Sequence, residues 1–460
     1  MTPDRIRVSR SARSDATTVL TLGILSTFIG IPTSILVART LGPSGKGVVM
    51  LASTVAGYST TMLGLGIDVA LVHFAGRAPE TARSLARIAI RLGIALGLLA
   101  AIAGTVLLLT AYRDRIPDSV LPWAVVLVAL GPVWLVASYL QSIIVGIGRL
   151  IEVSVIQFVN AVLTLIGAVL LVALLGLGAD GWLAVLALVF VVSGILTGVV
   201  SLKARVLPSA STAQGGYTYG RVTGYGMRAY FGTLLQGLNY RLDFFLVAFF
   251  LPIAQAGLYS ISVAATEILW VVPNNLGSVL MQRAASLPHS ESDRLTRAVT
   301  RITSLFLIVS SMALALVATP LVTLVFGNAF RGAVTPLLLL LPGTWALGLW
   351  KNVTNDLIGR GYPESKAISA GLSAAATVLL DLFLIPRFGI DGAAVASSAA
   401  YMLAFAVSLL QYERATGTGP LHLIVPRRGD LNLLIGVITR RSRRPPPIDE
   451  TAPAGSSSHS

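Results

Sequence analysis

Gly178-Ala179-Asp180-Gly181 recurs about 211 residues later in the chain as Gly389-Ile390-Asp391-Gly392, and Ile147-Gly148-Arg149 recurs at the same offset as Ile358-Gly359-Arg360. A third set of matches, at an offset of about 210, lies near the start of each half and comprises Val37-Ala38, Leu41 and Gly47 against Val247-Ala248, Leu251 and Gly257. Three matches in nearly one register indicate an ancient duplication, so we expect two homologous bundles. Symmetry of this kind is typical of many transporters, in which the substrate path lies between the repeats.

The composition of the chain indicates that these bundles lie in a membrane. Hydrophobic residues make up 55% of the chain and charged residues only 12%, and the mean hydropathy is +0.80. A soluble domain carries about 25% charged residues. Apolar runs of about 20 residues, each long enough to cross a hydrocarbon core about 30 Å thick, recur throughout the chain. There is no cysteine and the four histidines are scattered, so we expect neither a metal site nor a cofactor.

Hydropathy predicts an all-α membrane protein with about twelve transmembrane helices, six in each half. The expected spans of the first half are residues 17–38, 48–72, 88–111, 121–145, 153–176 and 181–202. Those of the second half are residues 229–251, 256–280, 299–319, 333–350, 366–385 and 392–411. Because each half has an even number of spans, we expect both halves to share one orientation, related by an axis along the membrane normal.

The distribution of positive charge predicts the orientation of the chain. If the N-terminus is cytoplasmic, 27 of the 34 Lys and Arg residues fall in cytoplasmic segments, six fall outside, and only Arg241 lies within a span. Cytoplasmic loops of membrane proteins carry such an excess of positive charge. We therefore expect a multi-pass protein of the plasma (inner) membrane with both termini cytoplasmic. We attribute the net charge of +14 to this orientation, and we expect no nucleic-acid partner.

The expected domain organisation follows from the spans. It comprises a basic cytoplasmic N-terminus (1–14), an N-lobe (15–202), a cytoplasmic inter-lobe linker (203–228), a C-lobe (229–412) and a basic, largely disordered cytoplasmic tail (413–460). The arginine cluster at 440–444 in the tail favours contact with an anionic inner leaflet.

The segment Gly42-Pro43-Ser44-Gly45-Lys46-Gly47 invites comparison with a phosphate-binding loop. It lacks the spacing G-x-x-x-x-G-K-[ST], and no strand is expected before it. We therefore interpret the segment as a tight turn between the first two spans, on the outer side of the membrane, and we expect no nucleotide site there.

Polar side chains within the spans are the candidate site residues, because they are costly in hydrocarbon and usually face a bundle interior or a water-filled cavity. Gln236, Asn239 and Asp243 of the seventh span are spaced three and four residues apart and share one helical face. Arg241 points about 200° away from Asp243, at about 100° per residue. Arg241 and Glu267 of the eighth span both lie roughly 15–18 Å below the turn that joins these spans, so they are placed to pair.

Two interpretations of these residues stay open. In the first, Arg241 and Glu267 form a structural ion pair that locks two helices, with Asp243 bonded to a neighbour. In the second, Arg241 faces a cavity and attracts an anionic substrate, while Asp243 or Glu267 takes part in proton or ion coupling. Arg39 lies where a span meets the headgroups. It therefore either lines the mouth of the cavity or extends its charge to the headgroups, and the second is the usual behaviour of an arginine at such a position.

Several motifs between about residues 15 and 412 form a set that is typical of one membrane-protein family. They are Ala38-Arg39-Thr40-Leu41-Gly42-Pro43-Ser44-Gly45-Lys46-Gly47, Tyr240-Arg241-Leu242-Asp243, Gly257-Leu258-Tyr259-Ser260 with Glu267, Phe326-Gly327, Leu341-Pro342-Gly343, Ile358-Gly359-Arg360-Gly361-Tyr362-Pro363 and Ile385-Pro386-Arg387-Phe388-Gly389-Ile390-Asp391-Gly392-Ala393-Ala394. In these motifs the chain resembles the polysaccharide-biosynthesis flippases (O-antigen or teichoic-type repeat units) of the multidrug/oligosaccharidyl-lipid/polysaccharide (MOP) superfamily. The motifs are mostly structural, so they identify the family better than the substrate.

The resemblance implies two six-helix lobes around a central cavity, which rock between inward and outward states. The cargo would be a polyprenyl-pyrophosphate-linked oligosaccharide, moved from the inner to the outer leaflet for export of a cell-surface polysaccharide. Its partners would be this lipid-linked anionic glycan, membrane lipids, and glycan polymerase or glycosyltransferase components. A diphosphate that crosses hydrocarbon needs a buried cation, and Arg241 is the only one expected at mid-depth. Related lipid II flippases carry several cavity cations and two further helices, which argues against lipid II as the cargo.

A MATE-like, ion-coupled exporter of small molecules is the main alternative, because it shares the architecture and because Asp243 with Glu267 would supply an acidic cavity for a cation. A membrane glycan polymerase or glycosyltransferase would need large loops with catalytic acids or a metal motif. The expected outer loops are too short for that, so we expect a transporter rather than an enzyme. A purely structural membrane partner is the remaining alternative.

Overall fold

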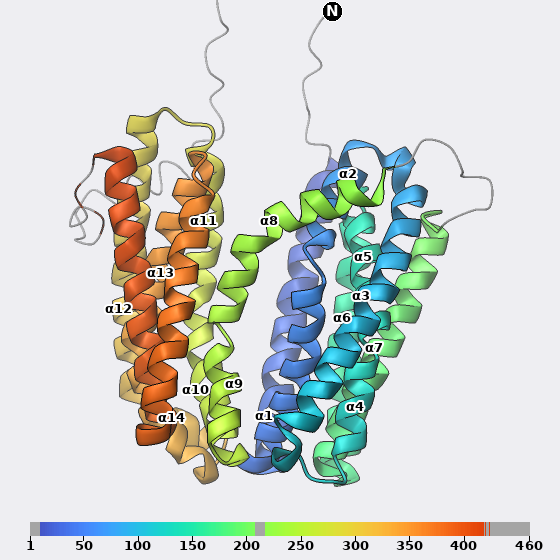
Figure 1. The fold of residues 1–460 in the computed structure, drawn as a ribbon, viewed down its shortest axis with the longest axis vertical. Helices are drawn as coiled ribbons and strands as arrows, with labels where there is room; N and C mark the ends of the chain where they lie inside the picture. The colour runs from blue at the N-terminus through green and yellow to red at the C-terminus, as the bar shows by residue number, and fades with distance from the viewer. Residues whose placement is uncertain (1–9, 208–216, 418, 420–422, 424–460) are drawn as a thin grey trace, which may run out of the picture.

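The computed structural model describes residues 10–207, 217–417, 419 and 423, and its helices form two bundles (Figure 1). The first bundle contains α1 (Arg10–Leu63), α2 (Ile67–Arg77), α3 (Ala82–Thr110), α4 (Leu121–Ala129), α5 (Gly131–Gly146), α6 (Leu150–Gly167) and α7 (Gly178–Lys203). The second contains α8 (Tyr219–Asn239), α9 (Leu242–Phe250), α10 (Ile253–Glu267), α11 (Val271–Ala284), α12 (His289–Val325), α13 (Val334–Gly359) and α14 (Glu364–Thr416). No strand occurs in the described part of the chain, so the all-α prediction is confirmed. The predicted N-terminus 1–14 and tail 413–460 lie mostly outside these residues.

The longest helices each supply two membrane spans. Nine helical segments among the described residues are long and apolar enough to cross a membrane. Thr17–Leu63, with 47 residues, and Glu364–Thr416, with 53, would be roughly 70–80 Å long if straight, more than twice the thickness of a hydrocarbon core. Each is kinked at a glycine with positive φ, Gly42 (64°) in α1 and Gly389 (61°) in α14. Together with α8 and α9, which divide the expected span 229–251 between them, the helices account for the twelve predicted spans.

Several helix ends differ from the prediction, because mean hydropathy does not register local breaks in a helix. The expected span 48–72 is interrupted at 64–66, where Leu65 and Gly66 have positive φ, and α2 follows the interruption. α8 begins at Tyr219, inside the expected linker 203–228, and α13 continues to Gly359 instead of ending near residue 350.

The Gly-x-Asp-Gly repeat has the same local structure in both bundles. Gly178 and Gly389 have φ angles of 64° and 61°, and the last span of each bundle follows the reversal that each glycine makes. Three residues later, Gly181 and Gly392 each lie against a leucine carbonyl of the preceding span. A side chain at either position would separate the two spans, which explains why glycine recurs there.

The turns that follow α5 and α13 have the same backbone structure, but the predicted alignment of Ile147-Gly148-Arg149 with Ile358-Gly359-Arg360 is wrong by two residues. Gly148 corresponds to Gly361 and not to Gly359, because both have positive φ (85° and 94°) and both donate the backbone N–H to the carbonyl three residues earlier. Gly146 corresponds to Gly359, since these residues end α5 and α13 and each packs on an alanine of the second span in its bundle. The backbone conformation requires a Gly-x-Gly pattern, whereas the flanking Ile and Arg are not constrained in the same way.

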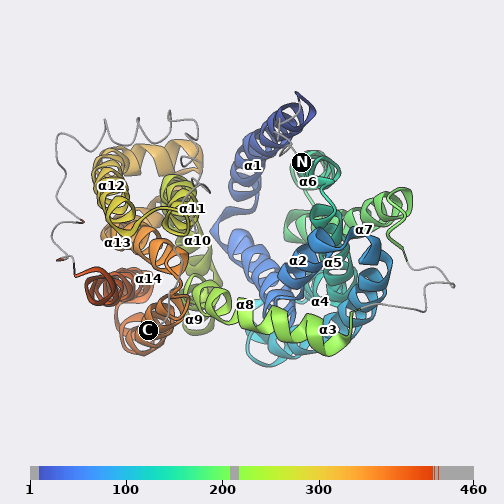
Figure 2. The same ribbon diagram turned by 90° about the horizontal axis from the view of Figure 1, so that it is seen from above.

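Two repeat-related glycines join the bundles where α1 crosses α10. A Cβ atom added to Gly47 would lie 2.0 Å from the carbonyl oxygen of Ile253, and one added to Gly257 would lie 2.0 Å from that of Pro43. The repeat offset of about 210 residues relates Gly47 to Gly257 and Pro43 to Ile253. The two contacts are therefore equivalent, as expected at a pseudo-twofold axis. We call these four residues the glycine joint. The bundles meet at this end and diverge toward the other end, where α8 crosses between them (Figures 1 and 2).

Candidate functional site

Arg241 and Glu267 form the ion pair that their predicted depths suggested. Nη2 of Arg241 lies 3.0 Å from Oε1 of Glu267, and 23% and 30% of the two side chains are exposed. The hydroxyl of Tyr58 on α1 donates to the carbonyl of Gly237 (3.1 Å) and also interacts with Arg241. The first bundle therefore borders a pair that the second bundle supplies, and the pair stays partly accessible at the junction between them.

Both members of the pair lie at interruptions of their helices. α8 ends at Asn239 and α9 begins at Leu242, and Arg241 is the N-cap of α9 with a non-helical φ of −137°. After Glu267, the chain makes a single 3-10 turn before α11. Pro273 explains this second interruption, because it lacks the N–H that would bond to the residue four positions earlier. Discontinuous membrane helices of this kind form binding sites in many transporters.

Lys351 is a second buried cation beside the pair, and the sequence analysis missed it. Only 7% of this residue is exposed, and its Nζ lies 4.4 Å from the ring centroid of Trp270 and 5.1 Å from that of Tyr240. It also interacts electrostatically with Glu267. The expected span 333–350 ended one residue too early, so Lys351 was assigned to a cytoplasmic segment. Val353 and Leu357 continue the apolar spacing three and seven residues after Trp350, and this periodicity is the sequence signal that would have extended the span past Lys351.

Asp243 and Asn239 are both directed into the second bundle, but the single helical face on which they were predicted is interrupted between them. Asp243 is 2% exposed and accepts hydrogen bonds from the hydroxyls of Tyr259 (2.6 Å) and Ser397 (3.0 Å). Asn239 is 0% exposed and bonds to two hydroxyl groups of α14. These residues hold the interrupted helix against α10 and α14, whereas Arg241 is directed toward the neighbouring bundle.

Asp381 on α14 belongs to the same buried core. It is 0% exposed, and within the described part of the chain neither of its carboxyl oxygens has a hydrogen-bond partner. Its charge interacts with that of Asp243. A carboxyl group without a partner is costly inside a membrane bundle, so this core has the chemistry to exchange a proton or a small cation.

The two remaining candidate residues have different surroundings. Gln236 is half-buried on α8, five residues before Arg241. Arg39 donates hydrogen bonds to the backbone carbonyls of Val325 (2.7 Å) and Leu324 at the C-terminal end of α12. A cation is favourable there, because it satisfies the last carbonyls and the negative end of the helix dipole. Arg39 therefore links the two bundles near the glycine joint and is not part of the Arg241 site.

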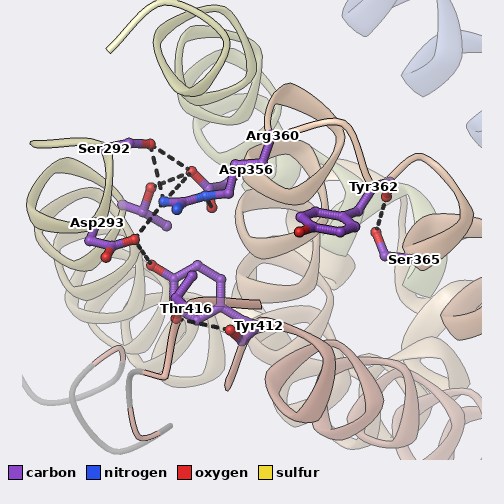
Figure 3. Close-up of polar contacts among 9 residues, drawn as sticks. Ser292, Asp293, Asp356, Arg360, Tyr362, Ser365, Tyr412 and Thr416 are labelled. Carbon is purple, nitrogen blue, oxygen red and sulfur yellow. Dashed lines mark hydrogen bonds and ion pairs between the residues drawn. The ribbon is translucent and has the colours of Figure 1, made fainter. Parts of the chain in front are cut away.

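A second polar cluster of the second bundle, drawn in Figure 3, surrounds Arg360 at the C-terminal end of α13. Arg360 pairs with Asp356 (2.6 Å) and Asp293 (2.7 Å), and only 5% of the Arg360 side chain is exposed. Ser292 and Tyr412 bond to the same groups. The cluster connects α12, α13 and α14, and its buried, mutually satisfied charges indicate a structural role. In the sequence, Arg360 stands out only as part of the Ile358-Gly359-Arg360 repeat and of a family motif, and neither predicts this cluster.

Residues 36–335 match the model of a family described as "Polysaccharide biosynthesis protein". No curated protein sequence matches the chain.

Several solved structures share the fold. An inward-facing multidrug resistance MATE family transporter of the MOP superfamily is similar with a TM-score of 0.68 at 14% identity, over 87% of this chain and 98% of that one. The lipid II flippase MurJ in an inward closed conformation is similar with a TM-score of 0.66 at 13% identity, over 93% of each chain. An outward-facing MATE family transporter gives a TM-score of 0.61 at 16% identity, over 87% of this chain and 94% of that one.

Proposed function

The chain belongs to the polysaccharide biosynthesis protein family and has the fold of MOP-superfamily transporters, and from this premise we propose that it is a flippase for a lipid-linked glycan. Its cargo in this proposal is a polyprenyl-pyrophosphate-linked oligosaccharide. The bundles alternate between inward and outward states and carry the cargo from the inner to the outer leaflet of the plasma membrane. The exported glycan then enters a cell-surface polysaccharide.

The observation that carries the proposal is the partly exposed guanidinium of Arg241 between the bundles. A guanidinium group presents paired N–H donors that match the oxygens of a phosphate, and it is always charged. The diphosphate of the cargo is the part that is hardest to move through hydrocarbon, so a cation at the junction of the bundles lowers the largest cost of the crossing. Arg241 is supplied by a helix interruption, where its side chain can leave the packed face of the bundle.

Lys351 and Glu267 complete a site that suits an anion. Glu267 is the shared counter-ion of two cations, so the three side chains together carry a net positive charge. When the diphosphate arrives, its oxygens replace the single carboxylate of Glu267 as partners of Arg241 and Lys351. When the cargo leaves, Glu267 pairs with both cations again, so neither is left alone in a low-dielectric environment.

An ion-coupled exporter of small cations is the second candidate, and the buried carboxyl groups favour it. Asp243 and Asp381 lie in the core of the second bundle, and a small cation could neutralise them. In the flippase proposal the same core exchanges the coupling ion or proton, while the cargo binds at Arg241. The two functions therefore differ in the charge of the molecule that crosses.

The proposal is tested with the full-length protein in proteoliposomes. The cargo is undecaprenyl pyrophosphate that carries a short labelled oligosaccharide, and the measurement is its appearance in the opposite leaflet. We expect Arg241→Ala to slow transport at least tenfold and Arg241→Lys to retain part of it, because lysine keeps the charge and loses the planar fork. Lys351→Met should reduce transport as well. Arg331→Ala, at an exposed position outside the site, is the matched control.

The double variant Arg241→Ala/Glu267→Ala separates cargo recognition from helix locking. If Arg241 only neutralises Glu267, removing both charges should restore transport, because no unpaired buried charge remains. If Arg241 binds the diphosphate, the double variant should insert normally and still fail to transport. Wild-type transport of the lipid-linked glycan by this variant would rule out the recognition role of Arg241. Efflux of ethidium in place of the lipid-linked glycan by the unmodified protein would refute the flippase proposal.

A further inference from the structure

Lys46 of the first bundle lines a cavity that the Arg241 site does not explain. The cavity holds about 300 Å³ and lies between α1, α6 and α7. Its polar lining comprises Thr33, Ser34, Lys46 and Thr164, and Trp182 supplies an aromatic wall. Lys46 lies just after the kink at Gly42, on the segment that the sequence analysis interpreted only as a turn.

The charge of Lys46 has no counter-ion among the residues that the structure describes. Lys46 is half-buried, and no carboxylate among the residues that the structure describes forms an ion pair with it. A lysine at the end of a span usually extends its ammonium group to water or to the headgroups, but this one lines a cavity between three helices. It also lies in the first turn after the kink, where the helix dipole adds positive potential. The cavity is therefore suited to an anion.

The hydroxyl groups of the cavity restrict the ligand further. The hydroxyls of Thr33 and Thr164 donate their hydrogens to the backbone carbonyls of Ile29 and Asn160, both at 2.7 Å. These two side chains therefore offer only acceptor lone pairs to a ligand, which must bring its own donors. A molecule with an acidic group and several free hydroxyls meets both requirements, and a bare carboxylate does not.

Trp182 adds a third requirement. Aromatic rings present a large, rigid apolar face, and ligands that bind such a face have apolar surface of their own. A pyranose ring has one face of C–H groups and a rim of hydroxyls. A sugar that also carries a carboxylate or a phosphate ester therefore fits the tryptophan, the threonine acceptors and the lysine at once.

We propose that the Lys46 cavity binds an acidic sugar residue of the glycan cargo, at the end of the molecule where the bundles are joined. This inference rests on the proposed function and narrows its substrate class to glycans that carry negative charge. Lys46 is adjacent to Gly47 of the glycine joint, so a sugar bound in this cavity contacts the segment of α1 that holds the bundles together. Binding of the sugar is thereby placed beside the contact that must open to release cargo.

The test measures sugar binding by the full-length protein in nanodiscs of phosphatidylcholine. The probe is a tetrasaccharide of alternating glucuronate and N-acetylglucosamine, and its neutral counterpart is a tetramer of N-acetylglucosamine. We expect the acidic probe to quench the fluorescence of Trp182, and the signal to disappear in Trp182→Phe. Lys46→Met should weaken binding at least tenfold, Lys46→Arg should retain it, and Arg331→Ala should leave it unchanged. Thermal unfolding of each variant verifies that it is folded.

Several outcomes would overturn the proposal. They are the absence of binding by the acidic probe, equal binding of both probes, and binding that is unaffected by Lys46→Met. Phosphatidylglycerol also combines an anion with hydroxyl donors, so the assay is repeated with this lipid in the nanodiscs. If phosphatidylglycerol displaces the acidic probe in a manner that depends on Lys46, the cavity is a lipid-headgroup site and the sugar proposal is wrong. The assay involves no transport step, so its result does not depend on the Arg241 experiments.

Discussion

Charge balance at single residues distinguishes the two arginine sites of the second bundle. Arg241 shares Glu267 with Lys351, so cations are in excess and the pair is partly exposed. Arg360 has two carboxylate partners, Asp356 and Asp293, and is 5% exposed. An accessible excess of positive charge can accept an anionic ligand, whereas a buried cation with satisfied partners holds helices together. The sequence alone could predict the Arg241–Glu267 pair from depth, but not this difference.

Arg360→Ala should strongly destabilise the second bundle. The substitution leaves Asp356, which is 0% exposed, without its cation, and breaking a buried pair from one side costs about 3–5 kcal/mol. Arg149→Ala is the matched control, because Arg149 pairs with Glu152 at a half-exposed position in the first bundle, where a loss of about 0–1 kcal/mol is expected. Unfolding in detergent measures both. Equal destabilisation by the two substitutions would contradict the structural role of the Arg360 cluster.

At the scale of elements, glycines and helix interruptions decide how the spans pack. Gly42 and Gly389 reverse the two longest helices, and the interruptions beside Arg241 and Glu267 release polar side chains from packed faces. The glycine joint is a close backbone contact between the bundles, since no side chain fits between Gly47 and α10. Because closely packed helices do not deform continuously, the crossing of α1 and α10 is either fully formed or broken.

Gly47→Ala should open the joined end of the molecule. The added Cβ would lie 2.0 Å from the carbonyl oxygen of Ile253, and overpacking of this kind typically costs about 1–3 kcal/mol. The chain contains no cysteine, so spin labels at Ser119→Cys and Asn328→Cys report the distance between the bundles at this end without competing thiols. We expect a longer and broader distance distribution in Gly47→Ala.

Gly57→Ala on the same helix is the control for the glycine joint. A Cβ at Gly57 meets no atom within 4 Å, so the distance distribution should stay as in the unsubstituted protein. If Gly47→Ala also leaves the distribution unchanged, the joint does not hold the bundles together.

For the whole molecule, the orientation in the membrane decides which state the structure represents. The bundles are joined where α1 crosses α10 and diverge toward the end where α8 crosses between them (Figure 1). If the positive-charge prediction is correct, the diverging end faces the cytoplasm and the structure is an inward-facing state. Reporter fusions measure this directly: a fusion at Pro117 should report the outside and one at Pro288 the inside. The reverse result at either position would refute the predicted topology.

The properties that depend on local composition are predictable from the sequence. The membrane environment, the helical spans and the family follow from hydropathy and motifs, and the pairing of Arg241 with Glu267 follows from their similar distance from the turn between their spans. The duplication and the mid-membrane depth of this pair stay predictions. Properties that depend on contacts between helices are visible only in the three-dimensional structure. In the structure, Lys351 of α13 lies beside Glu267 of α10, and Asp243 is directed into the second bundle. The structure also shows that the repeated turn aligns by its Gly-x-Gly pattern, and that Lys46 lines a cavity. The physical reason is that burial in hydrocarbon is a property of each segment, whereas packing and charge pairing depend on contacts between residues that are far apart in the chain.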